Sequence, residues 1–361
     1  MERFGIVGLP NAGKSSLFNA LTGGRATVAP HPFSTTETNV GVAKVPDDRL
    51  TRLAAMSESR KVVPAVAEFV DIAGLQKGSA QGEGLGNRFL HGIREADAVC
   101  YVLRAFEDEN VVGGTAPLDD LATLELELTL ADATSAEGQL ERRRKAGRFN
   151  KSDKEAAAQL EALEQAMVLL QDATPLYRAG LAAETIANLQ PFFLITAKPV
   201  LAVVNLGEDQ VVDADSVVAP VSAELGGTAE VLGVSVQLEA EAAQLDPGER
   251  SELLEGLGLG EGALPRVIHR AYHLLGLRTF LTTGDKESRA WTFRAGAKAP
   301  ECAGVIHSDL QRGFIRAEVI RWDELLALGS WARAKELGKL RVEGKDYEAK
   351  DGDVLEIRFN V

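Results

Sequence analysis

A glycine-rich segment near the N-terminus has the residue types and the spacing of a phosphate-binding loop. Residues 8–15 read Gly-Leu-Pro-Asn-Ala-Gly-Lys-Ser, the pattern G-x-x-x-x-G-K-S. The glycines of such a loop let backbone N–H groups turn toward phosphate oxygens, the Lys14 ammonium contacts the terminal phosphates, and the Ser15 hydroxyl ligates Mg²⁺. The sequence therefore predicts a nucleoside triphosphate site, whose candidate binding residues in this loop are Asn11, Ala12, Gly13, Lys14, Ser15 and Ser16.

A carboxylate and a glycine follow an apolar run later in the chain, in the segment Asp71-Ile72-Ala73-Gly74. An Asp at a strand end beside the phosphates can hold Mg²⁺ through a water molecule, and a Gly N–H can reach the γ-phosphate. We therefore predict that Lys14, Asp71 and Gly74 form the catalytic group. Ser15 and Asp71 are then the predicted metal-binding residues.

The Pro-punctuated loop at 30–37 lies between these two motifs and contains adjacent hydroxyl residues, Thr35 and Thr36. A polar loop of this kind can order around a γ-phosphate and Mg²⁺ and relax after hydrolysis. Either threonine could supply a second hydroxyl ligand to the metal. The residues alone do not decide between them.

A third segment, Asn205-Leu206-Gly207-Glu208, follows the apolar run 199–204 and has the place of a base-recognition motif. Guanine-specific sites have N-x-x-D with Lys at the second position, and the Asp accepts two hydrogen bonds from guanine. Here that position is Leu206, and the longer Glu208 side chain displaces the paired contact. Because a site built for buried polar contacts rejects a base that cannot make them, guanine is disfavoured. The segment 222–224, Ser-Ala-Glu, resembles the short motif that flanks the base on its other side in such sites, which makes Ser222 and Ala223 the candidates there.

The elements that must position these residues form an alternating strand and helix pattern. Apolar runs at 4–7, 67–70, 98–103 and 199–204 are typical of buried parallel strands. Each of the three motifs directly follows one of these runs. The pattern predicts an α/β nucleotide-binding fold.

A helical segment interrupts this pattern between about 118 and 190. Leu121, Leu124, Leu128 and Ala131 have coiled-coil spacing, and so do Leu160, Leu163, Met167 and Leu170. We expect the two series to form the seam of an inserted helical hairpin. Its tip is basic, and the candidate RNA-contacting residues are Arg142, Arg143, Arg144, Lys145 and Arg148. A solvated charged loop is the alternative.

The C-terminal part changes character and alternates apolar and polar residues, with Leu355, Ile357, Phe359 and Val361 on one side. This predicts a small α+β domain. The expected boundaries are 1–117 and 191–277 for the nucleotide-binding domain, 118–190 for the helical insertion and 278–361 for the C-terminal domain.

Composition restricts the remaining possibilities. With 39 Lys and Arg against 53 Asp and Glu, the formal net charge is −14, so bulk charge disfavours nucleic-acid binding and only a local basic patch would suit it. Cys100 and Cys302 cannot build a disulfide framework. The longest uncharged run, 185–197, is too short to cross a bilayer, and no signal peptide precedes the first strand. We expect a cytoplasmic protein without a membrane partner.

Several motifs together carry a family resemblance. The loop at 8–15, the segment 33–35, the motif extended through 71–78 and the glycine-rich segment 82–87 resemble the Obg-related branch of translation-factor GTPases. Within that branch they are most similar to the YchF/Obg-like ATPase family. The resemblance continues through the helical insertion into residues 299–309, which resemble a ubiquitin-like β-grasp TGS domain.

The resemblance implies a Ras-like P-loop domain with a coiled-coil insertion, an Mg²⁺-dependent ATPase and a switch threonine, Thr35, on the metal. Its N-x-x-E variant implies ATP as ligand and GTP as a weaker one, and the family association is with the ribosome or its RNA. An Asn at the position of Asn11 holds K⁺ in stimulated relatives, although a turn-forming role is equally compatible.

The chain departs from its relatives at two positions, because Leu75 stands where GTPases often have a water-orienting Gln and Gly113 where the family has a His. Gln76 is an alternative water-orienting residue, but it is one position displaced. We expect slow hydrolysis without a partner. A nucleotide-gated ribosome- or RNA-binding module with little hydrolysis, or a GTPase, remains the alternative.

Overall fold

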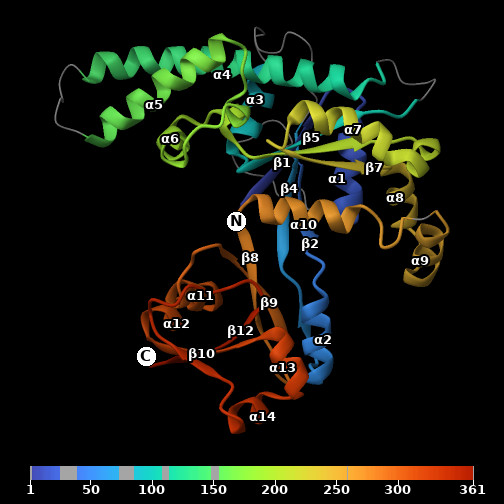
Figure 1. Ribbon diagram of the computed structural model, residues 1–361, viewed down its shortest axis with the longest axis vertical. Coiled ribbons are helices and arrows are strands. Elements are labelled where there is room, and N and C mark those ends of the chain that lie inside the picture. The colour runs from blue at the N-terminus through green and yellow to red at the C-terminus, as the bar shows by residue number, and fades with distance from the viewer. Residues whose placement is uncertain are drawn as a thin grey trace. The chain divides into compact units, whose positions relative to one another are not determined.

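The computed structural model describes residues 2–24, 39–72, 85–107, 114–147, 154–257 and 259–360. The chain divides into two units, one made of residues 1–43 and 68–267, the other of 44–67 and 268–361 (Figure 1). No helix within the described residues combines the length and the apolar character that crossing a membrane requires.

The first unit is built on a six-stranded sheet in the order β2-β4-β1-β5-β6-β7. The strands β4, β1, β5, β6 and β7 pair in parallel, so their carboxyl ends meet at one edge. All four apolar runs of the sequence lie in strands of this sheet, which confirms the α/β prediction. The bounds are β1 (Arg3–Gly8), β2 (Asn39–Lys44), β4 (Val66–Asp71), β5 (Ala98–Arg104), β6 (Val200–Asn205) and β7 (Glu230–Val234).

Helices follow and connect the strands of this sheet. They are α1 (Lys14–Thr22), α3 (Leu85–Glu95), α4 (Pro117–Gly147), α5 (Lys154–Gln171), α6 (Ala183–Leu189), α7 (Ala214–Leu225), α8 (Val236–Ala242) and α9 (Pro247–Gly256). Helix α10 (Leu264–Leu274) begins at the end of the first unit and continues into the second. Short 3₁₀ helices are η2 (Leu176–Arg178), η3 (Gln190–Phe192), η4 (Ile195–Ala197) and η5 (Glu208–Asp213). Helix α1 begins at the phosphate-loop lysine and ends at Gly23, whose φ of 67° is the left-handed conformation that suits glycine at a helix end.

The long helix α4 differs from the seam expected of it. Its first apolar series, Leu121, Leu124, Leu128 and Ala131, packs in the core with side chains of the parallel sheet. The contact between α4 and α5 begins further along, where Ala136 and Leu140 pack with Leu163 and Ala166. The assignment of the first series to the hairpin seam was therefore wrong. Helical spacing reveals which face of a helix is apolar, but the tertiary fold decides what covers that face.

Asp132 fixes the middle of α4 to the chain segment that leads into β6. Its carboxylate is fully buried and accepts hydrogen bonds from the Ile195 N–H (3.0 Å), the Thr196 N–H (2.7 Å) and the Thr196 hydroxyl (2.8 Å). Burial raises the pKa of Asp132, while these three donors act against that shift. Because β6 ends at Asn205, this anchor helps to set the position of the base-recognition segment.

The second unit is a six-stranded sheet in the order β11-β10-β12-β8-β9-β3. Leu355 and Ile357 of β12 pack against its core, whereas Phe359 is 47% exposed and Val361 lies outside the described residues. The strands are β3 (Val62–Val63), β8 (Leu277–Thr282), β9 (Ser288–Arg294), β10 (Phe314–Arg321), β11 (Arg341–Glu343) and β12 (Asp353–Phe359). The helices are α2 (Asp48–Met56), α11 (Ala299–Ile306), α12 (Ser308–Arg312), α13 (Trp322–Leu328) and α14 (Trp331–Glu336).

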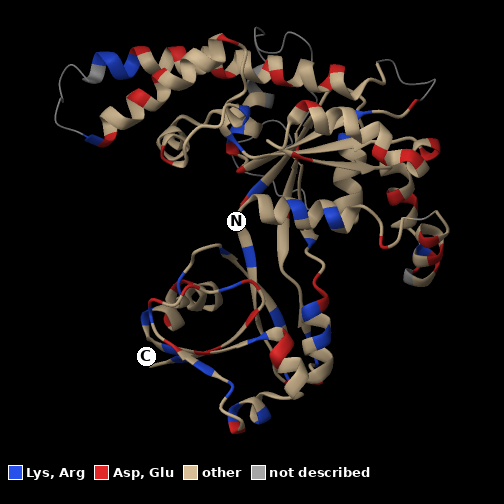
Figure 2. Ribbon diagram, in the orientation of Figure 1, with Lys and Arg blue, Asp and Glu red and all other residues tan. Residues whose placement is uncertain are grey.

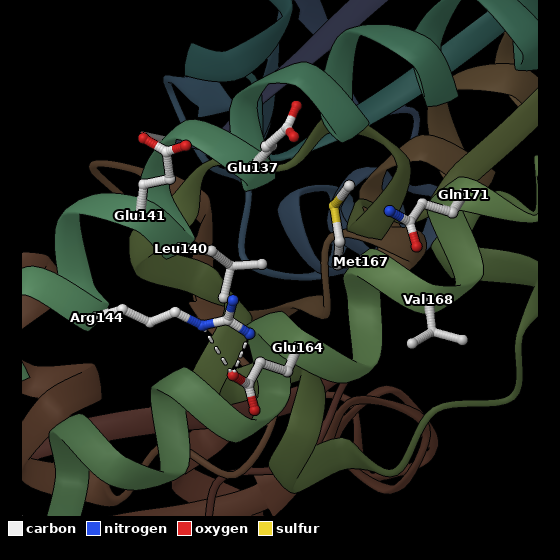
Figure 3. Close-up of a pocket in the computed structure, with 8 residues that line it drawn as sticks. All are labelled: Glu137, Leu140, Glu141, Arg144, Glu164, Met167, Val168 and Gln171. Atoms are coloured by element: carbon white, nitrogen blue, oxygen red, sulfur yellow. Dashed lines mark hydrogen bonds and ion pairs between the residues drawn. The ribbon is translucent and has the colours of Figure 1, made fainter.

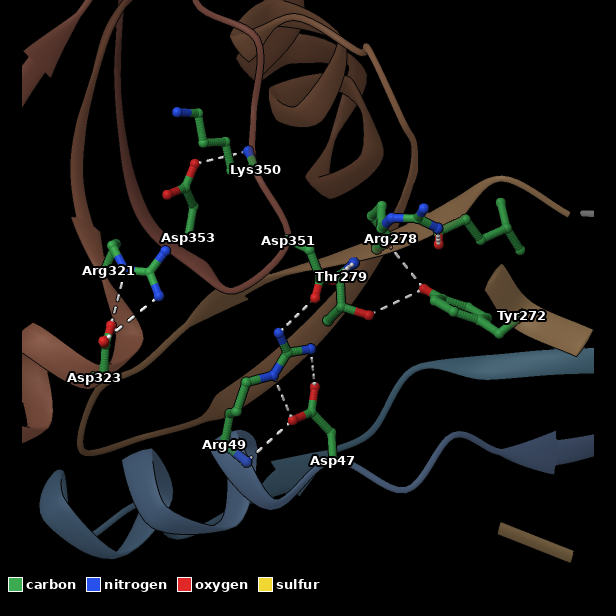
Figure 4. Close-up of polar contacts among 11 residues, drawn as sticks. Asp47, Arg49, Tyr272, Arg278, Thr279, Arg321, Asp323, Lys350, Asp351 and Asp353 are labelled. Carbon is green, nitrogen blue, oxygen red and sulfur yellow. Dashed lines mark hydrogen bonds and ion pairs between the residues drawn. The ribbon is translucent and has the colours of Figure 1, made fainter. Parts of the chain in front are cut away.

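Residues 44–67 belong to this second unit, although they lie between two strands of the first in sequence. Strand β3 pairs in parallel with β9, and α2 is held by a polar network (Figure 4). The Arg49 guanidinium donates to Asp47 (2.8 Å) and to Asp351 (2.7 Å), and Asp351 accepts from the Thr279 N–H (2.9 Å). The sequence contains no local signal that residues 44–67 belong to the second unit, because the contacts that join them to residues 268–361 are distant in the chain.

Candidate functional site

The phosphate loop connects β1 to α1 at the carboxyl edge of the parallel sheet. Asn11 and Gly13 both have positive φ angles, of 63° and 93°. Asn tolerates this left-handed conformation, so loop geometry alone accounts for its presence at position 11. At position 13 a Cβ atom would collide with the side-chain amide of Asn205, so glycine is required there.

Lys14 lies at the first position of α1 with its side chain buried against the loop. Its ammonium group donates to the Leu9 carbonyl at 2.8 Å. Burial lowers the pKa of Lys14, and the negative charges of Asp71 and Asp120 oppose that change. The lysine is therefore held beside the loop by its hydrogen bond to a backbone carbonyl, which a bound phosphate could replace, and it lies within electrostatic reach of two carboxylates.

Ser15 and Asp71 come together as predicted from their motifs. The Ser15 hydroxyl donates to Asp71 Oδ2 at 2.8 Å, which joins the start of α1 to the end of β4. Burial raises the pKa of Asp71, whereas the Ser15 hydrogen bond and the Lys14 charge lower it. A hydroxyl and a carboxylate are oxygen ligands of the kind that Mg²⁺ prefers.

These two side chains fit the way in which phosphate sites hold Mg²⁺, with one or two protein oxygens and the remaining ligands from phosphates and water. Over the ranges that the structure describes, no cluster of three or more His, Cys, Asp or Glu residues could hold a metal by protein ligands alone. A metal at Ser15 and Asp71 would thus depend on the nucleotide for part of its coordination.

Asn205, at the end of β6, links the phosphate loop to the neighbouring strand connection. Its Nδ2 donates to the Ala12 carbonyl at 3.0 Å, and its Oδ1 accepts from the Val236 N–H at 3.2 Å. The side chain is only 4% exposed. One carboxamide therefore joins the β1–α1 loop, the end of β6 and the start of α8.

The other two residues of the predicted base segment lie in different environments. Leu206 is 3% exposed and packs in the core of the first unit, and its N–H donates to the Val234 carbonyl at 2.9 Å. Glu208 is exposed at the first position of η5. Leu206 thus anchors the segment to the core of the first unit, whereas the Glu208 carboxylate is accessible to a ligand.

Ser222 and Ala223, expected beside the base, are not brought to this site. They lie exposed in the last turn of α7, where their carbonyls accept from the Gly226 N–H. Because α7 runs from the carboxyl end of β6 to the amino end of the parallel strand β7, its last turn lies at the opposite edge of the sheet. Ser235 directly follows β7 and precedes Val236, so it has the place that the sequence assigned to Ser222.

A signal for Ser235 was present in the sequence, because it follows the apolar segment 230–234 as the other motifs follow their strands. The short Ser-Ala pattern at 222–223 was a weaker guide than position after a strand.

A buried carboxylate near Lys14 was missed. Asp120, in the first turn of α4, accepts a hydrogen bond from the Arg104 N–H at the end of β5, at 2.9 Å. Its charge acts on Lys14, and burial raises its own pKa. The sequence shows this residue only as part of an acidic helix start, which is common at helix N-termini for reasons unrelated to a ligand.

Several predicted residues lie outside the described part of the chain. Thr35, Gly74 and Arg148 belong to this group, as do the alternatives and departures discussed with them, Thr36, Leu75, Gln76 and Gly113.

The end of α4 near the hairpin tip is rich in Lys and Arg (Figure 2), and some of these side chains make contacts within the hairpin. The Arg143 guanidinium donates to Gln159 at 2.7 Å and lies 4.6 Å from the centre of the Phe192 ring. Arg144 forms an ion pair with Glu164 at 2.7 Å. Arg142 is exposed, and exposed Lys145 lies 3.8 Å from Glu141. Because the Lys145–Glu141 ion pair is long and both side chains are largely exposed, it holds Lys145 weakly, so Arg142 and Lys145 are more available than Arg143 and Arg144.

Comparisons with known proteins cover both ends of the chain. A family model described as "50S ribosome-binding GTPase" matches residues 3–134, and the model YchF-GTPase_C, described as a protein of unknown function, matches residues 277–360. A relative called "Ribosome-binding ATPase YchF" from Bacillus subtilis (strain 168) is 46% identical over 363 residues, with 99% of each chain covered. One of the same name from Haemophilus influenzae is 44% identical, again with 99% of each chain covered.

A solved structure, "Structure of the Schizosaccharomyces pombe YchF GTPase", superposes with a TM-score of 0.84 at 30% identity. The match covers 99% of this chain and 97% of that one. The names of these relatives differ in the nucleotide: the two bacterial proteins are called ATPases, and the Schizosaccharomyces pombe protein is called a GTPase.

We predict that replacing Asn205 with Ala lowers the free energy of unfolding by about 2 kcal/mol, because the buried Ala12 carbonyl and Val236 N–H both lose their partner. Urea unfolding measures this change, and Asn19→Ala, at an exposed position of α1, is the matched control. Equal stability of the two variants would show that the Asn205 bridge contributes nothing.

Proposed function

The chain belongs to the YchF family, and we propose that it is a ribosome-binding ATPase that acts as a nucleotide-dependent switch. The observation that carries this proposal is the single constellation in which Lys14, Ser15, Asp71 and Asn205 are connected through the phosphate loop. The printed names of the bacterial relatives support the ribosome as partner.

In this proposal the protein residues position the triphosphate and balance its charge. The loop N–H groups and the N-terminus of α1 face the phosphates, and Lys14 exchanges its contact with the Leu9 carbonyl for phosphate oxygens. Ser15 and Asp71 hold Mg²⁺, Asp71 through water, with Thr35 as the further ligand that the family resemblance assigns. The bound metal would supply charge neutralisation on the phosphates.

We propose ATP as the preferred nucleotide, with GTP as a weaker ligand. Leu206 stands where guanine-specific sites have a lysine along the base, and its side chain is buried in the core, so it takes no polar part in base binding. Glu208 is exposed at the position of the guanine-binding Asp, and its side chain is one methylene longer. Asn205 completes the segment. Ser235 replaces Ser222 and Ala223 as the residue that we place on the far side of the base, because it follows β7 directly.

Hydrolysis is proposed to be slow without a partner. Leu75 follows the D-x-x-G motif, and a leucine side chain cannot orient a water molecule by hydrogen bonding. K⁺ near Asn11 is a further proposed cofactor, although the left-handed backbone there already explains an Asn. Ribosome binding also implies a cytoplasmic location.

A second candidate function is a binding module in which the nucleotide only gates docking to the ribosome. The observation that favours it is Leu75 in place of a water-orienting residue. The two candidates differ in whether phosphate is released over many turnovers.

Replacing Lys14 with Ala is expected to weaken ATP binding about 100-fold, since a charge-assisted hydrogen bond contributes roughly 1.5–3 kcal/mol. Calorimetric titration with Mg-ATP measures this, and Lys335→Ala, at an exposed position of α14, is the control. Multiple-turnover phosphate release by the unaltered chain should be slow alone and faster with ribosomes.

Unchanged ATP affinity in the Lys14 variant would contradict the assignment of the phosphate loop as the ATP-binding site. Ribosome binding without any turnover would instead favour the binding module.

For contact with ribosomal RNA we propose the exposed charges Arg142 and Lys145. Changing both to Gln should lower the slope of ribosome co-sedimentation against salt, on logarithmic axes, by roughly two, because about one counterion is released for each phosphate contact. Lys335→Gln with Lys339→Gln, two exposed lysines of the second unit, is the control. If both pairs change the slope equally, general charge and not the tip explains the attraction.

A further inference from the structure

An open groove of about 510 Å³ lies between the helices of the hairpin, α4 and α5 (Figure 3). It is formed within the first unit and at a distance along α4 from Asp120 and the phosphate loop. Its lining residues are Glu137, Leu140, Glu141 and Arg144 of α4 and Glu164, Met167, Val168 and Gln171 of α5.

The groove has a mixed lining in which polar surface predominates, and its accessible apolar surface lies mainly on α5. Leu140 is almost completely buried between the helices, Met167 is partly buried, and Val168 is 66% exposed. The lining residues of each helix are spaced i, i+3, i+4 and i+7, so two ridges face each other across the groove. This is the arrangement into which an amphipathic helix can lay its apolar face.

The apolar surface continues along α4 beyond the groove. Leu126 and Leu130, 49% and 40% exposed, lie on the same helical face as Glu137 and Glu141 by their spacing. From Leu126 to Arg144 this face is about 27 Å long at 1.5 Å per residue. A helix of some five turns would match it.

The charge of the groove selects the kind of partner. Glu164 is neutralised by Arg144, at one end of the groove (Figure 3). Glu141 has Lys145 at 3.8 Å, both side chains being largely exposed, and Glu137 forms no ion pair with any residue in the described ranges. The lining residues themselves carry three carboxylates against one guanidinium, and this excess of negative charge favours a cationic segment over nucleic acid.

We propose that this groove, with the adjoining face of α4, docks a basic amphipathic helix of a partner protein. Apolar side chains of that helix rest on Leu130, Met167 and Val168, and its lysines or arginines meet Glu137 and Glu141. The proposal is independent of the nucleotide chemistry. A partner protein would thus bind along the groove between α4 and α5, whereas in the proposed function ribosomal RNA contacts Arg142 and Lys145 near the hairpin tip.

The test uses a fluorescein-labelled peptide of about 18 residues made of Leu, Lys and Ala, with Leu at i, i+3, i+4 and i+7. A second peptide has the same composition in an order that gives no apolar face. Fluorescence anisotropy with the full chain should show the first peptide binding about tenfold more tightly than the second, a difference of roughly 1.4 kcal/mol.

Two variants locate the binding surface. Glu137→Gln with Glu141→Gln should weaken peptide binding about tenfold, through loss of two charge pairs of up to roughly 1 kcal/mol each. Glu252→Gln with Glu255→Gln, exposed on α9, changes the net charge equally and should leave affinity within about twofold. Val168→Lys should also weaken binding about tenfold, while Val305→Lys, at an exposed position of α11, should not.

The changed side chains at the groove are exposed, so the variants are expected to fold, and circular dichroism confirms this for each. Equal losses in the groove and α9 variants would overturn the proposal, because general acidity would then explain the binding. Equal binding of the two peptides would overturn it as well. So would displacement of the peptide by a single-stranded RNA of the same length, since the groove would then take nucleic acid.

Discussion

The hydrogen bonds of the Asn205 carboxamide are the constraint on which the rest of the candidate site depends. Its donor nitrogen binds the Ala12 carbonyl, and its acceptor oxygen receives the Val236 N–H. Only a side chain with both a donor and an acceptor can satisfy these two backbone groups, so Asp or Leu could not replace it. The same contact explains why position 13 must be glycine, because a Cβ there would collide with this amide. The phosphate loop and the proposed base-recognition segment are therefore joined by one buried side chain.

The surrounding fold places that side chain through long-range contacts. Asp132 in the middle of α4 holds the segment that leads into β6, and β6 delivers Asn205 to the loop. At the start of the same helix, Asp120 lies close enough to act on the Lys14 charge. Further along, α4 leaves the core and pairs with α5. One helix thus extends from the neighbourhood of Lys14 to the hairpin surfaces proposed for the partners.

Local motifs were predictable from the sequence, and long-range assignments were not. The phosphate loop, Asp71 and Asn205 each follow an apolar strand, and parallel strands bring their carboxyl ends to one edge, so their meeting followed from pattern alone. The fold class followed from the same runs. The partner of the Leu121–Ala131 series did not, because spacing does not identify the covering surface. Ser222 and Ala223 were chosen for their resemblance to a short Ser-Ala motif, whereas topology favours Ser235. The exchange of residues 44–67 into the second unit rests on contacts such as Arg49 with Asp351, which are far apart in the chain.

In the proposed function, the Asn205–Glu208 segment completes a triphosphate site that favours adenine over guanine. The most direct measurement is a pair of calorimetric titrations of the nucleotide-free full chain, one with ATP and one with GTP, each with Mg²⁺. We expect ATP to bind at least about tenfold more tightly than GTP, a difference of roughly 1.4 kcal/mol in binding free energy. GTP binding as tightly as ATP, or more tightly, would contradict it.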